Sequence, residues 1–377
     1  MRDDTVNVLY LLDEINQNRL GGSERQFMIF QKTLNNSSRI NPHVVFLRDS
    51  DVSAIPIWRN VPNILNLNSF KNPGFILKIY YLMRFISENK ISIVHTLLVD
   101  STIIGAMLKI LSPRLILIST QRNLGYLHTG FRRTLIKLAY KLSNAVVVNA
   151  TKIKETLVNL YGTSEDKIHV ISNIYEQREA DKDYHDSEFE KIRASHKHIS
   201  LIIANPKAIK GFYELVETAT ILKGKLDIAF VVLGAGADFE KARSTIVEKS
   251  LENEIYLLGF KTEINYYLQR VDFAILPSRS EGYSNALIEY IYHGVPTIAT
   301  NVGGNSEALE GGKYGILVEP RSPAALTDAV MMLVKNQDRY KAAALLGMQD
   351  FKTKFTVENS ISKHSKLYEE LWYNNRK

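Results

Sequence analysis

Short apolar runs alternate with longer amphipathic segments along most of the chain. Runs such as Val6–Leu11 have the length of buried strands, and the segments between them carry apolar residues at helical spacing. Parallel strands need a crossover connection, which is usually a helix, so this alternation predicts the α/β class. Strands are expected at Val6–Leu11, Val44–Leu47, Ile93–His95, Leu115–Ser119, Ala145–Asn149, His169–Ile171, Ile199–Ala204, Ile228–Leu233, Ile255–Leu258, Phe273–Leu276, Pro296–Ala299 and Ile316–Val318.

The alternation is interrupted between residues 176 and 196, where charge is dense and apolar periodicity is poor. A chain of 377 residues has room for two domains with separate cores. We therefore expect a Rossmann-like domain over residues 1–175, a linker over 176–196 and a second Rossmann-like domain over 197–355. A last helix, Val357–Tyr373, lies outside both patterns, in the final segment 356–377.

Composition and the first residues limit the class of protein. The sequence has no cysteine, which excludes a disulfide framework and thiolate chemistry. Arg2-Asp3-Asp4 leads into the first expected strand without a signal segment. No apolar run approaches the roughly 20 residues that a membrane span needs. These features predict a cytoplasmic protein.

The net charge of +7 is concentrated in one region. Residues 71–154 hold 13 Lys and Arg against 2 Asp and Glu, which indicates an anionic partner. No zinc-finger, RNA-recognition or basic-zipper signature accompanies this charge, so nucleic acid is disfavoured. An anionic membrane surface, at the inner face of the plasma membrane, or a lipid-linked diphosphate fits the charge better.

The segment 131–142 is the most basic helix candidate of this region. Its apolar residues, including Phe131 and Leu138, share one face, and its basic residues lie on another. Two interpretations stay open: a core-packed helix with a solvated basic side, and a helix that contacts a membrane surface. The residues assigned to the acceptor or membrane side are Arg122, Arg132, Arg133, Lys137 and Lys141.

Two carboxylates, Glu281 and Glu289, lie eight residues apart across an expected loop-to-helix junction. The strand Phe273–Leu276 precedes them, and Ser284 or Asn285 is the expected N-cap of the helix. Such a junction offers backbone N–H groups and a positive helix end to an anion, with a carboxylate on each side for hydroxyl groups. A phosphate flanked by two polyols fits this layout, and a nucleotide-sugar is built in that way.

Three further loops follow expected strands. Gly21-Gly22 and Gly234 allow the backbone to approach a ligand closely, and a flexible turn is the alternative for Gly21-Gly22. Lys207 and Lys210 lie three residues apart before a helix, a spacing that suits a phosphate clamp. An ordinary solvated basic loop is the alternative for the lysines.

These elements, from Gly21 to Glu307, occur in the order found in the family 4 (group 1) retaining glycosyltransferases, and the chain resembles that family. The segment from Glu281 to Glu289 resembles its Glu-x7-Glu motif. The resemblance implies the GT-B fold, with two Rossmann-like domains whose parallel sheets face a central cleft and a last helix that crosses back to the first domain. It also implies a nucleoside-diphosphate sugar donor, with no metal and no other cofactor.

The resemblance assigns roles to individual residues. His95 would contact the donor sugar, Lys210 would stabilise the departing diphosphate, and Glu281 would hold the donor sugar, which makes these three the catalytic candidates. The acceptor would be a glycan or lipid-linked molecule of bacterial surface polysaccharide synthesis (capsule, exopolysaccharide or lipopolysaccharide). The donor-binding residues would be Gly21, Gly22, Lys207, Gly234, Gly282, Tyr283, Ser284, Asn285 and Glu289.

Several alternatives compete with this interpretation. Asp49 and Asp51 copy the metal-binding Asp-x-Asp of GT-A glycosyltransferases, but a solvated turn is the favoured explanation, because a GT-A protein would not carry the other motifs in this order. The segment 234–236 lacks the third glycine and the acidic residue of a dinucleotide site. A sugar-nucleotide epimerase would need further acid and base groups. A non-catalytic scaffold subunit is suggested by Asn205 and Ile174, where the family usually has arginine and glycine.

Overall fold

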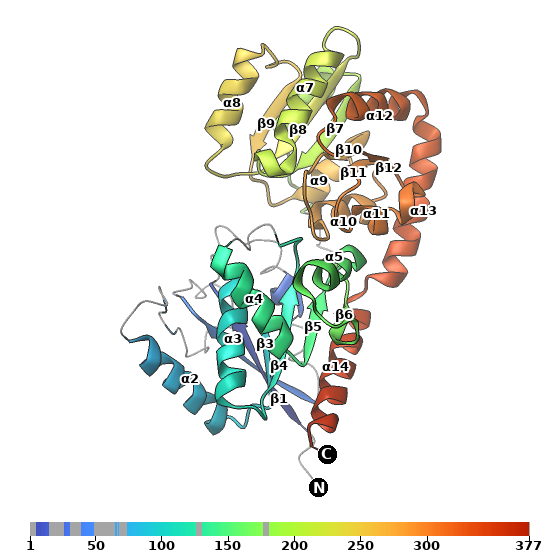
Figure 1. Ribbon diagram of the computed structural model, residues 1–377. Helices are drawn as coiled ribbons and strands as arrows, with labels where there is room; N and C mark the ends of the chain where they lie inside the picture. Colours follow the sequence, from blue (N-terminus) through green and yellow to red (C-terminus); the bar gives the residue numbers. More distant parts are fainter. Residues whose placement is uncertain are drawn as a thin grey trace. The chain divides into compact units, whose positions relative to one another are not determined.

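The computed structural model describes residues 5–14, 26–30, 39–48, 65, 67, 74–125, 130–175 and 181–376. The chain divides into two compact units. Unit 1 comprises Met1–Ile174 and Phe355–Lys377, and unit 2 comprises Tyr175–Lys354. Each unit contains one six-stranded sheet with helices packed on it (Figure 1).

The strands of the unit 1 sheet are parallel and follow the order β2-β1-β3-β4-β5-β6. The chain runs from β1 to the edge strand β2 and then returns to β3 on the other side of β1, so the topology reverses between β1 and β3. Open α/β sheets bind ligands at such a reversal, beyond the carboxyl ends of the strands. The strands are β1 (Val6–Leu12), β2 (Ile40–Phe46), β3 (Ile93–Thr96), β4 (Ile116–Gln121), β5 (Ala145–Val148) and β6 (Ile168–Val170).

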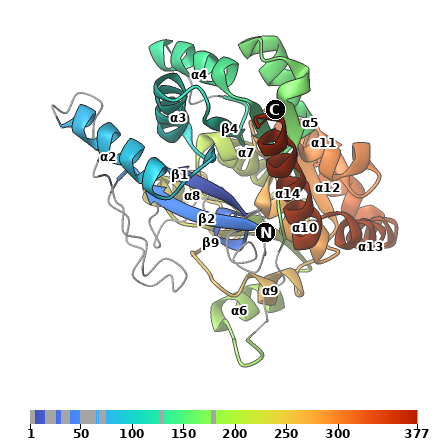
Figure 2. The same ribbon diagram turned by 90° about the horizontal axis from the view of Figure 1, so that it is seen from below.

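Helices cover both faces of the unit 1 sheet. One face packs against α2, α3 and α4, and the other packs against residues 26–30 and the last helix, α14. In Figure 2, α2, α3 and α4 lie on one side of β1 and β2, and α14 lies on the other. The helices are α2 (Phe75–Glu88), α3 (Val99–Leu111), α4 (Gly130–Leu142), α5 (Thr151–Thr156), which continues as a π-helical turn (Leu157–Tyr161), and α14 (Val357–Asn374).

The strands of the unit 2 sheet are also parallel, in the order β12-β11-β10-β7-β8-β9. Strands β8 and β9 lie on one side of β7, and the chain then returns to β10 on the other side. The topology of this sheet therefore reverses between β7 and β10. The strands are β7 (His198–Ile203), β8 (Ile228–Leu233), β9 (Ile255–Gly259), β10 (Phe273–Leu276), β11 (Thr297–Thr300) and β12 (Ile316–Val318).

The helices of unit 2 begin at polar caps in several places. The Asp186 carboxylate accepts hydrogen bonds from two N–H groups of α6, and the Ser322 hydroxyl caps α12, whose first residue is Pro323. The helices are α6 (Ser187–Ser195), α7 (Phe212–Leu222), α8 (Phe239–Glu248), α9 (Ile264–Leu268), α10 (Asn285–Tyr292), α11 (Asn305–Ala308), α12 (Pro323–Lys335) and α13 (Gln337–Lys354).

The expected α/β class is confirmed, and each half holds six parallel strands. The expected strand Val44–Leu47 began too late, because β2 starts at Ile40 and includes Pro42, which an edge strand tolerates. The helix over 131–142 packs on the core through residues other than the expected apolar face. Phe131 is 76% exposed and Leu138 is 46% exposed, whereas α4 buries Ile136, Ala139 and Tyr140.

Candidate functional site

Two of the predicted site residues meet at the topological reversal of unit 2. Lys210 lies in a 3₁₀ turn in the loop after β7, and Glu281 lies in the loop after β10. The Lys210 Nζ donates a hydrogen bond to Glu281 Oε1 at 2.7 Å. The Glu281 side chain is buried, while 34% of the Lys210 side chain stays exposed. The strand order therefore pairs a lysine with a carboxylate at the place where such sheets bind ligands.

A second hydrogen bond orients the Glu281 carboxylate. The Ser278 hydroxyl donates to the same Oε1 atom at 2.7 Å. The backbone carbonyl of Ser278 accepts in turn from the Thr300 hydroxyl at 2.5 Å, so the end of β11 supports the loop. Glu281 is thus held by two donors before any ligand binds, which fixes its direction.

The loop continues into α10, whose first turn lies at the same edge of the sheet. The Ser284 side chain accepts a hydrogen bond from Leu287 N, which confirms a helix start at this serine. Glu289, one turn into the helix, is buried. The Tyr290 hydroxyl accepts from Ile203 N at 2.7 Å and ties α10 to the end of β7. Burial raises the pKa of Tyr290, so it stays a neutral phenol.

At the carboxyl edge of the unit 2 sheet, the loops pack so closely that two positions admit only glycine. Gly211 has a φ of +75°, and a Cβ there would lie 1.9 Å from the Pro277 carbonyl oxygen. A Cβ on Gly234 would lie 2.3 Å from the Ala204 carbonyl oxygen. Asn205 joins the same two loops, because its Oδ1 accepts from Ala235 N at 2.9 Å. The asparagine at this position therefore has a structural role.

The remaining donor candidates surround this pair. Gly282 lies in the loop and Asn285 opens α10, and Tyr283 between them is buried, with a pKa raised by that burial. Lys207 is exposed, three residues before Lys210. The edge thus combines one lysine held by a carboxylate, a second exposed lysine and a helix start. This combination can receive a negatively charged group together with hydroxyl groups.

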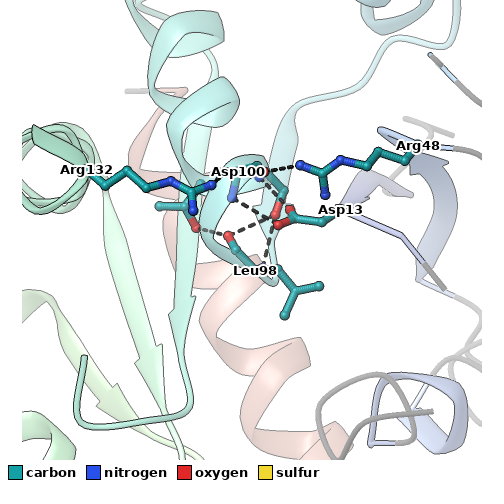
Figure 3. Close-up of polar contacts among 7 residues, drawn as sticks. Asp13, Arg48, Leu98, Asp100 and Arg132 are labelled. Atoms are coloured by element: carbon teal, nitrogen blue, oxygen red, sulfur yellow. Dashed lines mark hydrogen bonds and ion pairs between the residues drawn. The ribbon is translucent and has the colours of Figure 1, made fainter. Parts of the chain in front are cut away.

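The topological reversal of unit 1 holds a different polar cluster (Figure 3). Asp13, directly after β1, accepts hydrogen bonds from the backbone N–H groups of Asp100 and Ser101 at 3.0 and 2.7 Å and so caps α3. The Asp100 carboxylate is buried and contacts Arg48 and Arg132, which approach it from opposite sides. Burial raises the pKa of Asp13, and the two N–H groups oppose that rise.

Two residues assigned to the acceptor or membrane side, Arg132 and Arg122, make contacts within unit 1. Arg132 is half exposed, but its guanidinium pairs with Asp100 rather than pointing to solvent alone. Arg122 follows β4 and donates a hydrogen bond to Asn173 Oδ1 at 3.3 Å. Both arginines therefore lie at the carboxyl ends of the strands of unit 1.

His95 is fully enclosed in unit 1. It is 1% exposed, its Nδ1 lies 2.7 Å from the Tyr368 hydroxyl of α14, and its Nε2 lies 2.7 Å from the Thr120 hydroxyl. Burial holds its pKa well below the usual value, so the ring is neutral. A contact between His95 and a donor sugar would require one of these hydrogen bonds to be given up. That contact stays a prediction.

The three other basic candidates lie on α4. Arg133, Lys137 and Lys141 are exposed, and Arg133 also lies over the Tyr161 ring at 5.7 Å. They share the outer surface of the helix with the exposed Phe131 and Leu138. This surface, which we call the outer face of α4, is therefore both basic and apolar.

Some predicted residues lie outside the described part of the chain: Gly21, Gly22, Asp49 and Asp51. Within the described ranges, His, Asp and Glu side chains form no group of three that could hold a metal ion. Within the same ranges, no helix has the length and apolar character that crossing a membrane requires.

Sequence reasoning missed Asp13, Arg48, Asp100 and Ser278. Asp13 and Ser278 each follow a buried strand closely, and a polar residue at such a strand end was a signal available from the sequence. Arg48 and Asp100 carry no comparable signal, because their meeting depends on the order of strands in the sheet.

Comparisons with known proteins identify the family to which these elements belong. A family model described as Glycosyltransferase Family 4 matches residues 20–176, and one described as Glycosyl transferases group 1 matches residues 197–336. The Anabaena protein HepE, whose structure was determined in complex with UDP, superposes with a TM-score of 0.81 at 15% identity and covers 97% of this chain and 100% of that chain. The fold is GT-B. The chain belongs to the family 4 (group 1) glycosyltransferases.

Two curated relatives show how far the sequence similarity extends. An uncharacterized glycosyltransferase of Methanocaldococcus jannaschii is 32% identical over 148 residues, which are 39% of this chain and 42% of that protein. Poly(ribitol-phosphate) alpha-N-acetylglucosaminyltransferase of Staphylococcus aureus is 24% identical over 316 residues, which are 81% of this chain and 60% of that protein. The similarity therefore covers only about half the length of these relatives.

Proposed function

We propose that this protein is a retaining glycosyltransferase that moves a sugar from a nucleoside-diphosphate sugar to a glycan or lipid-diphosphate acceptor. The observation that carries the proposal is the Lys210–Glu281 pair at the topological reversal of unit 2. The pair combines the cation that a leaving diphosphate needs with a carboxylate that can accept from sugar hydroxyls. Family membership supports the same chemistry.

In this mechanism the work of unit 2 is electrostatic. When the bond to the sugar breaks, negative charge grows on the diphosphate, and a lysine already in place stabilises that charge without reorganising. Glu281 positions Lys210 through its 2.7 Å hydrogen bond, and Ser278 fixes the carboxylate. Lys207 adds a second positive charge, and Glu289 on α10 would hold the ribose. The incoming hydroxyl attacks from the side of the leaving group, and no metal takes part.

The donor and acceptor are proposed from chemistry and from relatives. A uridine diphosphate sugar is the first donor to test, because the structural neighbour HepE was determined in complex with UDP. An anionic acceptor fits the basic residues of unit 1, and the Staphylococcus aureus relative is named for a poly(ribitol-phosphate). We place the reaction in bacterial surface polysaccharide synthesis, in the cytoplasm, with the outer face of α4 against an anionic membrane.

A donor-hydrolysis screen tests the proposal. UDP-, GDP-, ADP- and dTDP-sugars are incubated with the protein, and nucleotide release is measured for the wild type and for Lys210→Ala. Lys225→Ala is the matched control, because Lys225 is an exposed lysine that precedes β8, at the opposite edge of the same sheet. Release by the wild type and the control, but not by Lys210→Ala, is expected.

Three results would contradict the proposal. If no donor is hydrolysed by the wild type, the non-catalytic scaffold subunit becomes the better description, and conversion of the sugar without transfer would favour the epimerase. Proton NMR of a transfer product reads the anomeric configuration directly, and an inverted centre would exclude the retaining mechanism.

A further inference from the structure

Two loops meet at the carboxyl edge of the unit 2 sheet, and more than the Lys210–Glu281 hydrogen bond joins them. The first loop follows β7 and carries Lys210, and the second follows β10 and carries Glu281. The backbone N–H of Arg279, two residues before Glu281, donates to the carbonyl oxygen of Ile209 at 2.9 Å. The second loop therefore contacts two successive residues of the first, through its backbone at Ile209 and through a side chain at Lys210.

The Arg279 side chain adds a contact on the far side of Lys210. Its Nε donates to Oε1 of Glu214 at 2.7 Å. Glu214 lies in the first turn of α7, which begins directly after the loop that carries Lys210. One residue of the second loop thus holds the chain at two points, through its backbone at Ile209 and through its side chain at Glu214. Lys210 lies between these two points in the sequence.

The contact between Arg279 and Glu214 is a largely buried ion pair. Only 4% of the Glu214 side chain and 25% of the Arg279 side chain are exposed. Within the described part of the chain, Arg279 is the only cation that pairs with Glu214, and the second carboxylate oxygen, Oε2, has no hydrogen-bond partner. A buried ion pair adds little to stability, because both charges lose their water, but removing one partner leaves an uncompensated charge. The geometry of the two loops is therefore tied to this pair.

A second ion pair of α7 provides a comparison. Glu217, about one turn further along the helix, pairs with Lys249 at 3.3 Å, and 47% of the Lys249 side chain is exposed. Exposed pairs of this kind contribute little, because water screens the charges and the side chains stay mobile. Helix α7 therefore has one buried pair with the loop after β10 and one exposed pair with the residue that ends α8.

We propose that Arg279 is a positioning residue that holds Lys210 beside Glu281 and so directs its ammonium group to the departing diphosphate. The proposal rests on the proposed function for the diphosphate, whereas the restraint on Lys210 needs no substrate. Without the Arg279 side chain, the described hydrogen bonds between the loops are reduced to one backbone bond and the Lys210–Glu281 bond itself. Because displacing a charge that stabilises the transition state lowers the rate strongly, kcat depends on this restraint more than donor binding does.

Amine labelling of the intact protein tests the restraint without any substrate. The protein is acetylated by a brief pulse of acetic anhydride, and the modification of each lysine is measured by mass spectrometry of its peptides. The internal reference is Lys261, which donates to the Asp186 carboxylate at the same 2.7 Å and is 21% exposed. In Arg279→Gln, acetylation of Lys210 should rise about 5- to 10-fold relative to Lys261, which corresponds to the loss of one hydrogen bond. An unchanged Lys210, or an equal rise at Lys261 from a general loosening of unit 2, would overturn the proposal.

Kinetic variants separate a positioning role from a general structural one. Arg279→Gln should lower kcat for donor hydrolysis about 10- to 100-fold with little change in the donor KM. Arg279→Lys should recover most of this loss, because a single nitrogen, Nε, makes the contact with Glu214. Lys249→Gln, which breaks the exposed pair of the same helix, is the matched control and should leave both constants unchanged.

A double-variant cycle identifies the contact through which Arg279 acts. Glu214→Gln should reproduce part of the loss, because its amide oxygen accepts from Nε without the charge, and adding it to Arg279→Gln should cost nothing further. Multiplicative losses, a loss confined to the donor KM, or no recovery in Arg279→Lys would overturn the assignment. If Arg279→Gln does not fold, labelling of Glu214→Gln decides the question in the same way. Absence of donor hydrolysis in the wild type would instead contradict the proposed function, and the labelling result would still decide whether Arg279 restrains Lys210.

Discussion

Acid should destabilise unit 1 through the buried His364 of α14, and the structure sets the size of the effect. The pKa of this histidine is lowered to about 4 in the folded chain, against about 6.5 in an unfolded one. Between these two values the unfolded state binds the proton more readily, so the free energy of unfolding falls as the pH falls. Going from pH 8 to pH 5 should cost about 2 kcal/mol through this residue alone. Below about pH 4 the loss levels off, because both states are protonated.

Other groups also make the free energy of unfolding depend on pH, so a variant is needed to isolate this residue. The lowered pKa of His95 adds to the loss, while the raised pKa of Asp13 opposes it, because a carboxyl that protonates more readily when folded gains stability in acid. His364→Gln cannot titrate and keeps a polar side chain at this buried position. The difference between wild type and variant, followed from pH 8 to pH 5, should therefore shrink by about 2 kcal/mol.

Tryptophan fluorescence provides the assay. The chain has two tryptophans, and Trp372 is buried in α14 against the core of unit 1. In a Trp58→Phe background, urea unfolding followed at Trp372 reports on the packing of the last helix, about two turns from His364 on the same helix. Parallel pH profiles for the wild type and His364→Gln would refute the reasoning, as would an imidazole pKa above 6 measured by NMR in the folded protein.

Three further results are expected. Turnover should survive EDTA, because lysines and a helix start replace a metal, and loss of turnover restored by Mg²⁺ or Mn²⁺ would contradict this. Lys210→Ala should lower kcat by on the order of 10²–10³-fold and Glu289→Ala far less, because diphosphate charge grows in the transition state, whereas equal effects would speak against these roles. The protein should sediment with anionic vesicles at low salt, and changing Arg133, Lys137 and Lys141 together to glutamine should weaken this by about 100-fold, whereas a wild type left in the supernatant would exclude membrane binding.

The sequence predicted the fold better than the contacts within it. Buried parallel strands are apolar throughout, so both sheets could be located from runs such as Ile228–Leu233, which matches β8 in both bounds. Helix α13 was not expected, because its buried residues are few and include small ones, Ala344 and Gly347, that leave a weak periodic signal. The core side of α4 was missed for a related reason. Its core side is made by Ile136, Ala139 and Tyr140, of which only one is a large aliphatic residue.

In the candidate site, local sequence predicts the individual residues, whereas the order of the strands determines which of them meet. Lys210 and Glu281 could each be predicted from its own motif, but their hydrogen bond follows from the chain returning to β10 beside β7. His95 shows the opposite case. Its place at a strand end suggested a ligand contact, yet α14 brings Tyr368 onto its Nδ1 from 273 residues away in the sequence. The partner of His95 is therefore set by the packing of the last helix, which no local pattern around His95 could predict.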